Sequence, residues 1–150
     1  MERSLVLLKP DAVQRGLVGR LISRLEQRGL KLVGMKLIHM DEDLANQHYS
    51  DHVNKPFFPG LVKFITSSPL VAIVAEGERA VEIVRSLMGN TDPLDSPIGT
   101  IRGDLALSVG LNLIHGSDSV ESASREIKLF FSPDEIISYN REIEKWITES

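Results

Sequence analysis

The sequence predicts an α+β fold in which helices cover one sheet. Four short apolar runs are typical of buried strands, helical periodicity fills most of the intervals between them, and no linker, repeat or low-complexity tract divides the chain. A chain of 150 residues is also long enough to bury a single hydrophobic core. We therefore expect one domain that spans residues 1–150.

In the first half of the chain, capping and breaking residues indicate where the elements begin and end. Pro10 stops the first apolar run, Gly29 supplies a helix C-cap, and Asp41 supplies a helix N-cap. The elements expected here are, in order, a strand over 4–9, a helix over 18–29, a strand over 30–40, a helix over 41–52 and a helix that begins near Phe57 and Phe58.

The second half is less regular. Pro93, Pro97 and Gly99 break the periodicity of residues 90–110, and so long a loop in a compact domain is either functional or wrongly assigned. The run Ser132-Pro133-Asp134-Glu135 has the cap, proline and acidic residue of a helix start. The elements expected here are a strand over 70–75, a helix over 81–89, the loop, a strand over 111–115, a helix over 120–130 and a last helix from 132.

The composition excludes several classes of protein. The chain has no cysteine, which excludes disulfides, thiolate nucleophiles and Cys-type zinc sites and favours a reducing compartment. No segment approaches the ~20 apolar residues of a membrane helix, and the first apolar run is too short for a signal peptide. The net charge of −4 is unlike that of a nucleic-acid binder. We expect a cytoplasmic protein that requires neither membrane nor nucleic acid.

The usual glycine-rich phosphate-binding motifs are missing. The chain contains neither G-x-x-x-x-G-K-[ST] nor G-x-G-x-x-G, so side chains would have to offset the charge of any bound phosphate. Lys9, Arg85 and Arg102 are candidates because each lies at the end of a segment or in the long loop. Taken singly, each is better explained as a solvated surface residue, so the hypothesis requires that they converge.

Among the four histidines, His115 has the most suggestive surroundings. It ends an apolar strand and is followed by Gly116, which leaves room for a substrate, and by the start of a helix that favours an anion. A histidine with an ordinary pKa of about 6.5 offers a neutral, nucleophilic ring near pH 7. Glu126 lies further along the helix and could orient the ring. From these residues alone, a core or capping histidine is an equally good interpretation.

The other histidines and the aromatic pair support weaker hypotheses. His48 and His52 have the i, i+4 spacing of a metal pair, but the glutamate of a zinc protease motif is missing and chance explains the spacing better. His39 fits a side chain at the end of a strand. Of Phe57 and Phe58, one is expected in the core, and the other could stack on a nucleobase.

Several motifs in one order resemble the nucleoside diphosphate kinase family. The closest is Asn112-Leu113-Ile114-His115-Gly116-Ser117-Asp118-Ser119, which resembles the family's active-site signature. The resemblance covers nearly the whole chain, from about Arg3 to Trp146. The other matching runs are Leu8-Lys9-Pro10-Asp11, Pro56-Phe57-Phe58-Pro59-Gly60-Leu61-Val62, Gly99-Thr100-Ile101-Arg102-Gly103-Asp104, and the continuation of the signature through Val120-Glu121-Ser122-Ala123.

The resemblance implies a function and a role for each matching residue. His115 would take the γ-phosphoryl group of a nucleoside triphosphate and give it to a diphosphate in a ping-pong reaction with low base selectivity. The residues that would hold the nucleotide's phosphates and sugar are Lys9, Arg85, Thr91, Arg102 and Asn112. Phe57 would stack on the base, near Leu61 and Val109. The supporting residues would be Glu126 and Ser117 beside the histidine, and Tyr49 near the phosphates and Lys9.

The same resemblance implies the fold, the metal and the assembly. The fold would be a ferredoxin-like sandwich, a four-stranded antiparallel sheet covered by helices. Mg²⁺ would arrive on the nucleotide with no direct protein ligand, and Asp118 would contact it at most through water. The chain would form a homo-oligomer, a hexamer in preference to a tetramer. Lys55 and Leu111 depart from the family, since many members have Arg at both positions, and this puts local contacts in doubt but not the chemistry.

Two other functions stay open at this point. The chain could be a regulatory or nucleotide-sensing domain that kept the fold and lost turnover, although the candidate nucleophile and phosphate-binding residues are all present. A metal-dependent hydrolase that uses His48 and His52 is the weaker alternative.

Overall fold

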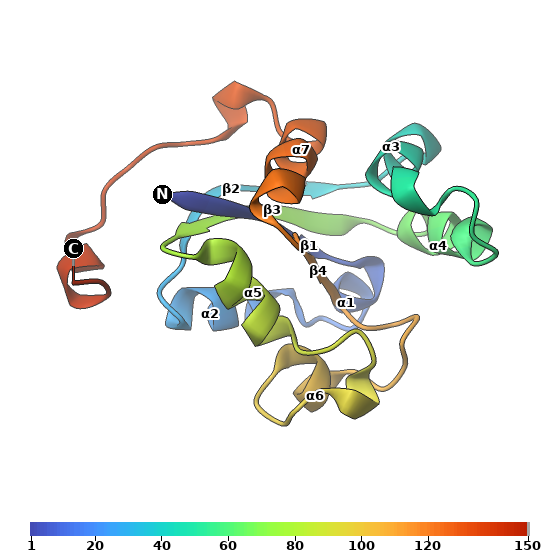
Figure 1. The fold of residues 1–150 in the computed structure, drawn as a ribbon, viewed down its shortest axis with the longest axis horizontal. Coiled ribbons are helices and arrows are strands. Elements are labelled where there is room, and N and C mark those ends of the chain that lie inside the picture. Colours follow the sequence, from blue (N-terminus) through green and yellow to red (C-terminus); the bar gives the residue numbers. More distant parts are fainter. Residues whose placement is uncertain (150) are drawn as a thin grey trace.

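The computed structural model describes residues 1–149, and their strands form a four-stranded sheet in the order β2-β3-β1-β4 (Figure 1). Each neighbouring pair is antiparallel. The strands are β1 (Glu2–Leu8), β2 (Lys31–Ile38), β3 (Leu70–Gly77) and β4 (Ile114–Gly116). The predicted α+β fold is confirmed, and the strand order is that of the ferredoxin-like sandwich.

Helices cover both faces of the sheet (Figure 1). The α-helices are α1 (Pro10–Gln14), α2 (Val18–Gln27), α3 (Glu42–His48), α4 (Phe58–Ile65), α5 (Ala80–Met88), α6 (Ile101–Leu105) and α7 (Val120–Phe130). The short 3₁₀ turns are η1 (Ser50–His52), η2 (Pro93–Asp95), η3 (Pro133–Glu135) and η4 (Glu142–Trp146). None of the helices in the described part of the chain is long and apolar enough to cross a membrane.

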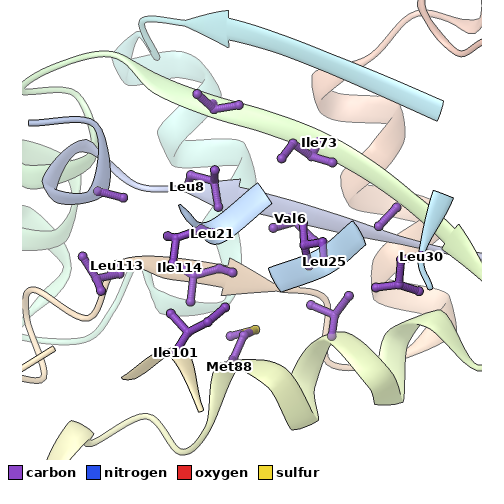
Figure 2. Packing of buried hydrophobic residues seen from close by; sticks show 14 of the residues in the cluster. Val6, Leu8, Leu21, Leu25, Leu30, Ile73, Met88, Ile101, Leu113 and Ile114 are labelled. Carbon is purple, nitrogen blue, oxygen red and sulfur yellow. The ribbon is translucent and has the colours of Figure 1, made fainter. Parts of the chain in front are cut away.

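The central strand β1 contributes to two hydrophobic cores because successive side chains of a strand point to opposite faces. Val6 and Leu8 pack with α2 and α5, whereas Leu5 and Leu7 pack with α3, α4 and α7. Figure 2 shows the first core, in which Leu21 and Leu25 of α2 and Met88 of α5 point toward the strands. The sheet is therefore buried on both faces. This explains why the sequences of its strands are nearly continuous apolar runs rather than strict alternations of apolar and polar residues.

Residues 90–110 are more ordered than their composition predicts. They contain η2 and α6, and Thr100 caps α6 by accepting a hydrogen bond from the Gly103 amide at 3.0 Å. Ile101 is fully buried in the first core, so the segment is packed against the domain at this point. The prolines and glycines do end regular structure, but short helical turns fit between them.

Three predicted boundaries are wrong. The helix expected over 41–52 ends at His48, after which η1 turns the chain toward α4. The last strand begins at Ile114 rather than at residue 111. The capping box of Ser132 and Glu135 forms, but it starts only the 3₁₀ turn η3, because the chain then runs in extended form beside β2, with the Ile137 amide donating to the Val33 carbonyl at 2.8 Å.

We expect Gly103→Ala to destabilise the protein. An added Cβ would lie 2.0 Å from the carbonyl oxygen of Pro97, a backbone atom that cannot move aside freely. Overpacking of this kind costs roughly 1–3 kcal/mol, and each kcal/mol lowers the Tm of a chain of this size by about 2–4 °C. Thermal unfolding at matched protein concentration measures the change.

Gly19→Ala is the matched control, because an added Cβ there meets nothing within 4 Å and Gly19 lies in α2. Alanine favours a helix over glycine by roughly 0.5–1 kcal/mol, so the Tm should stay constant or rise. A Gly103→Ala protein as stable as the parent would show that the α6 segment can shift to accept the methyl group.

Candidate active site

His115 lies in β4 on the face of the sheet that α3 and α7 cover. It pairs with Leu7 of β1, and paired residues of neighbouring strands point to the same side. Its side chain is 23% exposed, so the ring is held by the domain yet open to a small molecule. Its two chain neighbours face the opposite side of the sheet: the Ile114 side chain packs in the first core, and a Cβ added to Gly116 would point toward α5.

A chain of hydrogen bonds holds the His115 ring. Its Nε2 lies 3.1 Å from Oε1 of Glu126, and the same oxygen accepts a hydrogen bond from Ser117 Oγ at 2.8 Å. Ser117 Oγ in turn accepts from the Leu5 amide at 3.0 Å. Since a carboxylate only accepts, Nε2 carries the proton in this contact and Nδ1 keeps a free lone pair. The arrangement can present one ring nitrogen as a nucleophile.

Glu126 is ionised in this arrangement. Burial alone would raise the pKa of Glu126, but the hydrogen bond and charge of His115 and the hydrogen bond from Ser117 outweigh burial and lower it. The carboxylate therefore stays an acceptor across the neutral range, which preserves the tautomer of His115 that leaves Nδ1 free.

His48 packs edge-on against His115, with 4.8 Å between the ring centroids. It is 5% exposed, and neither of its ring nitrogens has a hydrogen-bond partner among the described residues. Burial, reinforced by the nearby charge of His115, lowers the pKa of His48 to about 3, so this ring is neutral near pH 7. The sequence placed His48 in a pair with His52, and the structure places it against His115 instead.

A cavity of about 210 Å³ opens beside these rings. Both positive and negative side chains reach it, so it suits a polar ligand better than an apolar one. The lining residues are His48, Tyr49, Asp51, His52, Arg85, His115, Gly116, Asp118, Ser122, Arg125 and Glu126. A larger cavity of about 410 Å³ is lined mainly by residues near Leu30, Gly77 and the C-terminal segment, and it includes none of the predicted site residues.

Lys9, Thr91 and Asn112 form a second group. Lys9 Nζ donates to Oδ1 of Asn112, whose Nδ2 donates to the Thr91 carbonyl oxygen at 2.9 Å. Burial lowers the pKa of Lys9 to about 8, and the charge of Arg102 adds to the effect while Asp11 opposes it. The ammonium thus keeps most of its charge near pH 7 and has lost much of its water, which strengthens its attraction for an anion.

Arg102 and Arg85 connect this group to His115. Arg102 is buried and donates to the carbonyl oxygens of Asn112 at 3.2 Å and Ile114 at 2.6 Å. Burial and the charge of Arg85 lower its pKa to about 10, so it remains a cation. Arg85 Nη1 lies 3.3 Å from the Gly116 carbonyl oxygen. The two guanidinium groups thus contact backbone carbonyl oxygens on either side of His115, and of the three predicted cations only Arg85 lines the cavity.

Asp11 and Leu113 shape the backbone before His115, and the sequence analysis assigned a role to neither. Leu113 has a φ of 75°, an uncommon left-handed conformation for leucine. Its amide donates to Oδ2 of Asp11 at 3.0 Å, and its carbonyl oxygen accepts from the Lys9 amide at 2.9 Å. The position of Asp11, two residues after Lys9, could have suggested that it belongs to the site. Nothing in the sequence pattern indicates the positive φ of Leu113.

Phe57 is the exposed member of the aromatic pair. It is 55% exposed, whereas Phe58 packs against the second core. Lys55 Nζ lies 5.7 Å from its ring centroid and the His52 ring 5.5 Å away. Of the other residues expected near a base, Leu61 is half-buried and Val109 is exposed. More than half of Phe57 therefore remains accessible to a ligand.

One expectation about the surroundings of His115 needs correction. Gly116 does not leave room for a substrate: an added Cβ would lie 2.5 Å from Met88 Sδ and 2.7 Å from Val84, so the glycine allows α5 to approach the sheet. Tyr49 lies against His48, with ring centroids 4.6 Å apart, and burial raises the pKa of its hydroxyl. It lines the cavity beside His115.

Comparison with known proteins identifies close relatives. The sequence profile of the family described as nucleoside diphosphate kinase matches residues 2–136. A nucleoside diphosphate kinase from Thermomicrobium roseum is 59% identical over 147 residues, which cover 98% of this chain and 99% of the relative. One from Gloeobacter violaceus is 54% identical and covers 99% of this chain and 100% of the relative.

Solved structures agree. The halophilic nucleoside diphosphate kinase from Halobacterium salinarum, solved in complex with CDP, superimposes with a TM-score of 0.96 at 52% identity, over 98% of each chain. A nucleoside diphosphate kinase family protein from Babesia bovis also gives a TM-score of 0.96, at 42% identity, over 99% of this chain and 100% of that one.

The ionised state of Glu126 predicts a pH dependence of stability. A carboxyl whose folded-state pKa is lowered below its ordinary value of 4.5 stabilises the fold above that value, and the contribution is lost as the pH falls through the lowered pKa. In Glu126→Gln this contribution is absent, so the free energy of unfolding should fall less steeply on acidification than in the parent. Denaturant unfolding across the acid range measures the slope.

Glu121→Gln serves as the control, because it removes an exposed carboxylate from the same helix. It should leave the acid slope close to that of the parent. Identical slopes for the parent and Glu126→Gln would mean that the contacts of Glu126 with His115 and Ser117 do not stabilise its charged form.

Proposed function

Because this chain belongs to the nucleoside diphosphate kinase family, we propose that His115 is the residue through which it moves phosphoryl groups. As a member of the family, it passes the γ-phosphoryl group of a nucleoside triphosphate to a nucleoside diphosphate. The observation that carries the proposal is the contact of His115 Nε2 with Glu126 at 3.1 Å, since it leaves Nδ1 as the free nucleophilic atom.

The transfer proceeds in two half-reactions. The Nδ1 lone pair attacks the γ-phosphorus, the bond from that phosphorus to the β–γ bridging oxygen breaks, and the diphosphate leaves with the electron pair. A second diphosphate then binds, its terminal oxygen attacks the phosphohistidine, and the N–P bond breaks to restore the ring. Glu126 stabilises the proton on Nε2 throughout, so no proton has to leave the site during transfer.

Cations offset the charge that moves. Lys9, Arg85 and Arg102 are suited to this role because the transition state spreads negative charge over the transferred group. Lys9 now donates to Asn112 and Arg102 to backbone carbonyl oxygens, so these partners hold both side chains near the site before the nucleotide arrives. Thr91 and Asn112 offer polar groups for the phosphates and the sugar.

The base is bound by stacking on Phe57. Its exposed ring offers a face of the kind that all bases can use, and stacking reads no base edge. Low selectivity among bases follows, with Leu61 and Val109 as apolar neighbours. The CDP in the halobacterial complex belongs to that protein, and it supports a pyrimidine nucleotide as one ligand here.

The residues of the site fit Mg²⁺ only when the ion is bound to the phosphates of the nucleotide. Of the three carboxylates that line the cavity, Glu126 is engaged by His115 and Ser117, whereas Asp51 and Asp118 are exposed. Mg²⁺ usually keeps several waters and binds through substrate phosphates and one or two carboxylates. Asp118 would therefore contact it through water, and the ion would supply neutralisation of phosphate charge.

Assembly and location remain predictions. Exposed apolar side chains at Leu107, Val109 and Leu111, and at Met35 and Leu37 on the edge strand β2, support a homo-oligomer, because monomers rarely expose such surface. A hexamer is expected in preference to a tetramer, with Leu111 in place of the family's Arg contributing apolar rather than charged surface. The cytoplasm is the expected location.

We expect His115→Ala to abolish labelling of the protein by γ-labelled ATP. In the parent, the label should be lost in acid, survive alkali and pass to added GDP, dTDP or CDP, as for a phosphohistidine. His39→Ala is the control, because His39 is exposed and bonds the Thr66 carbonyl oxygen instead. Labelling of His115→Ala at the parent's rate would place the nucleophile elsewhere.

The same experiment separates the alternatives. A parent protein that binds nucleotide and exchanges no phosphate even at high enzyme concentration would be a sensing domain. A metal-dependent hydrolase would release inorganic phosphate in place of labelled triphosphate, and would lose activity in a His48→Ala, His52→Ala double variant.

We expect Phe57→Ala to raise KM for purine and pyrimidine diphosphates alike. Loss of stacking on one base costs roughly 1–3 kcal/mol, which corresponds to about a 5- to 150-fold change. Phe57→Tyr keeps an aromatic face and should stay near the parent. Steady-state kinetics with GDP and CDP measure the effect, and a KM change confined to one of the two bases would contradict sequence-independent stacking.

A further inference from the structure

We propose that His48, His115 and Glu126 form a binding site for one divalent transition-metal ion of the zinc type, and that the bound ion blocks phosphoryl transfer. The ion is distinct from the Mg²⁺ that accompanies the nucleotide. The inhibitory part rests on the proposed role of His115, whereas the metal site itself does not.

The three side chains already converge. Each offers one ligand atom, and these atoms all lie within 4.8 Å of one another. A tetrahedral zinc ion with bonds of ~2.1 Å holds its ligand atoms about 3.4 Å apart, so small side-chain rotations would close the site. The three residues come from separate elements, α3, β4 and α7; α3 and α7 pack in the second core, and β4 is anchored in the first core through Ile114.

The unpartnered nitrogens of His48 are the second observation. Both nitrogens are buried and have no hydrogen-bond partner among the described residues. His48 as a whole is 95% buried, and it lines the cavity. A buried polar group left unpaired costs roughly 1–3 kcal/mol, so native structures seldom keep one without a reason. The neighbouring rings of Tyr49 and Phe130 pack against it, and neither supplies a conventional hydrogen-bond acceptor or donor to these nitrogens. A metal ion at the centre of the trio would satisfy one nitrogen.

The donor set selects the ion. Two imidazoles and one carboxylate with a free fourth position is the ligand set of many zinc enzymes, and imidazole favours zinc, copper, nickel and cobalt over magnesium. The cavity of about 210 Å³ leaves room for a water as the fourth ligand. Arg85 and Arg125 line the same cavity and oppose a cation, so binding should be weaker than at a site without them.

Binding would remove the nucleophile. A metal on Nδ1 of His115 takes up the lone pair that attacks phosphorus. A metal on Nε2 displaces the contact with Glu126 and leaves the proton on Nδ1, so the ring again has no free lone pair. The metal and the phosphoryl group therefore exclude each other, and excess Mg²⁺ would not relieve the inhibition at constant free zinc.

Co²⁺ is the probe, because its visible absorption reports the coordination shell. Titrated into the purified parent without nucleotide, it should give one site per chain with intense bands of a low-coordinate complex. His48→Phe keeps an aromatic ring in the core but removes one ligand, and Glu126→Gln removes another, so each should weaken binding at least about tenfold. Thermal unfolding verifies that both variants are folded, and His39→Ala should bind as the parent does.

The outcomes are separable. Equal Co²⁺ affinity for the parent and folded His48→Phe would overturn the metal site, as would binding that His39→Ala abolishes. If the parent binds Co²⁺ as expected and zinc slows labelling of His115 by ATP, both parts hold. If Co²⁺ binds but the label is found on another residue, the site stands and the proposed function falls. If His115 is labelled normally and no Co²⁺ binds, the metal inference alone fails.

Discussion

The geometry of the site depends on one buried carboxylate. Glu126 accepts a hydrogen bond from the protonated ring nitrogen of His115 and another from the hydroxyl of Ser117. Ser117 in turn accepts a hydrogen bond from the Leu5 amide of the central strand. Because β1 lies inside the sheet and is buried on both faces, this chain of bonds fixes the His115 ring to a strand that is paired on both sides and buried.

Near that ring, the proposed phosphate-binding cations Lys9 and Arg102 are already held by hydrogen-bond acceptors of the domain. Arg102 lies 95% buried among carbonyl oxygens, and Lys9 is held by Asn112, so both have paid most of their desolvation cost during folding. In the proposed function, little reorganisation would then be needed to bind phosphates, which is the condition under which fixed charges stabilise a transition state best. The same buried surroundings leave His48 without a hydrogen-bond partner beside His115.

Much of the fold could be predicted because capping residues and hydrophobic periodicity indicate where regular helices and strands begin and end. The N-cap at Asp41 forms as expected, with its side chain accepting from the Leu44 amide at 2.8 Å, and α7 spans the predicted residues 120–130. The predicted final helix is wrong although its capping box forms, because Ile137 bonds to β2 instead and the distant strand competes with local helix formation. Local signals carry no information about such a partner.

The sequence by itself determined the order of the strands and the family, and it supplied the residues proposed to carry the chemistry, since periodicity, caps and motifs are properties of neighbouring residues. Only the tertiary structure decided that His48 meets His115 rather than pairing with His52, that Gly116 serves the packing of α5, and that Leu113 takes a left-handed conformation. These facts arise from contacts between segments far apart in the chain, where close packing and the need to pair buried polar groups select the arrangement.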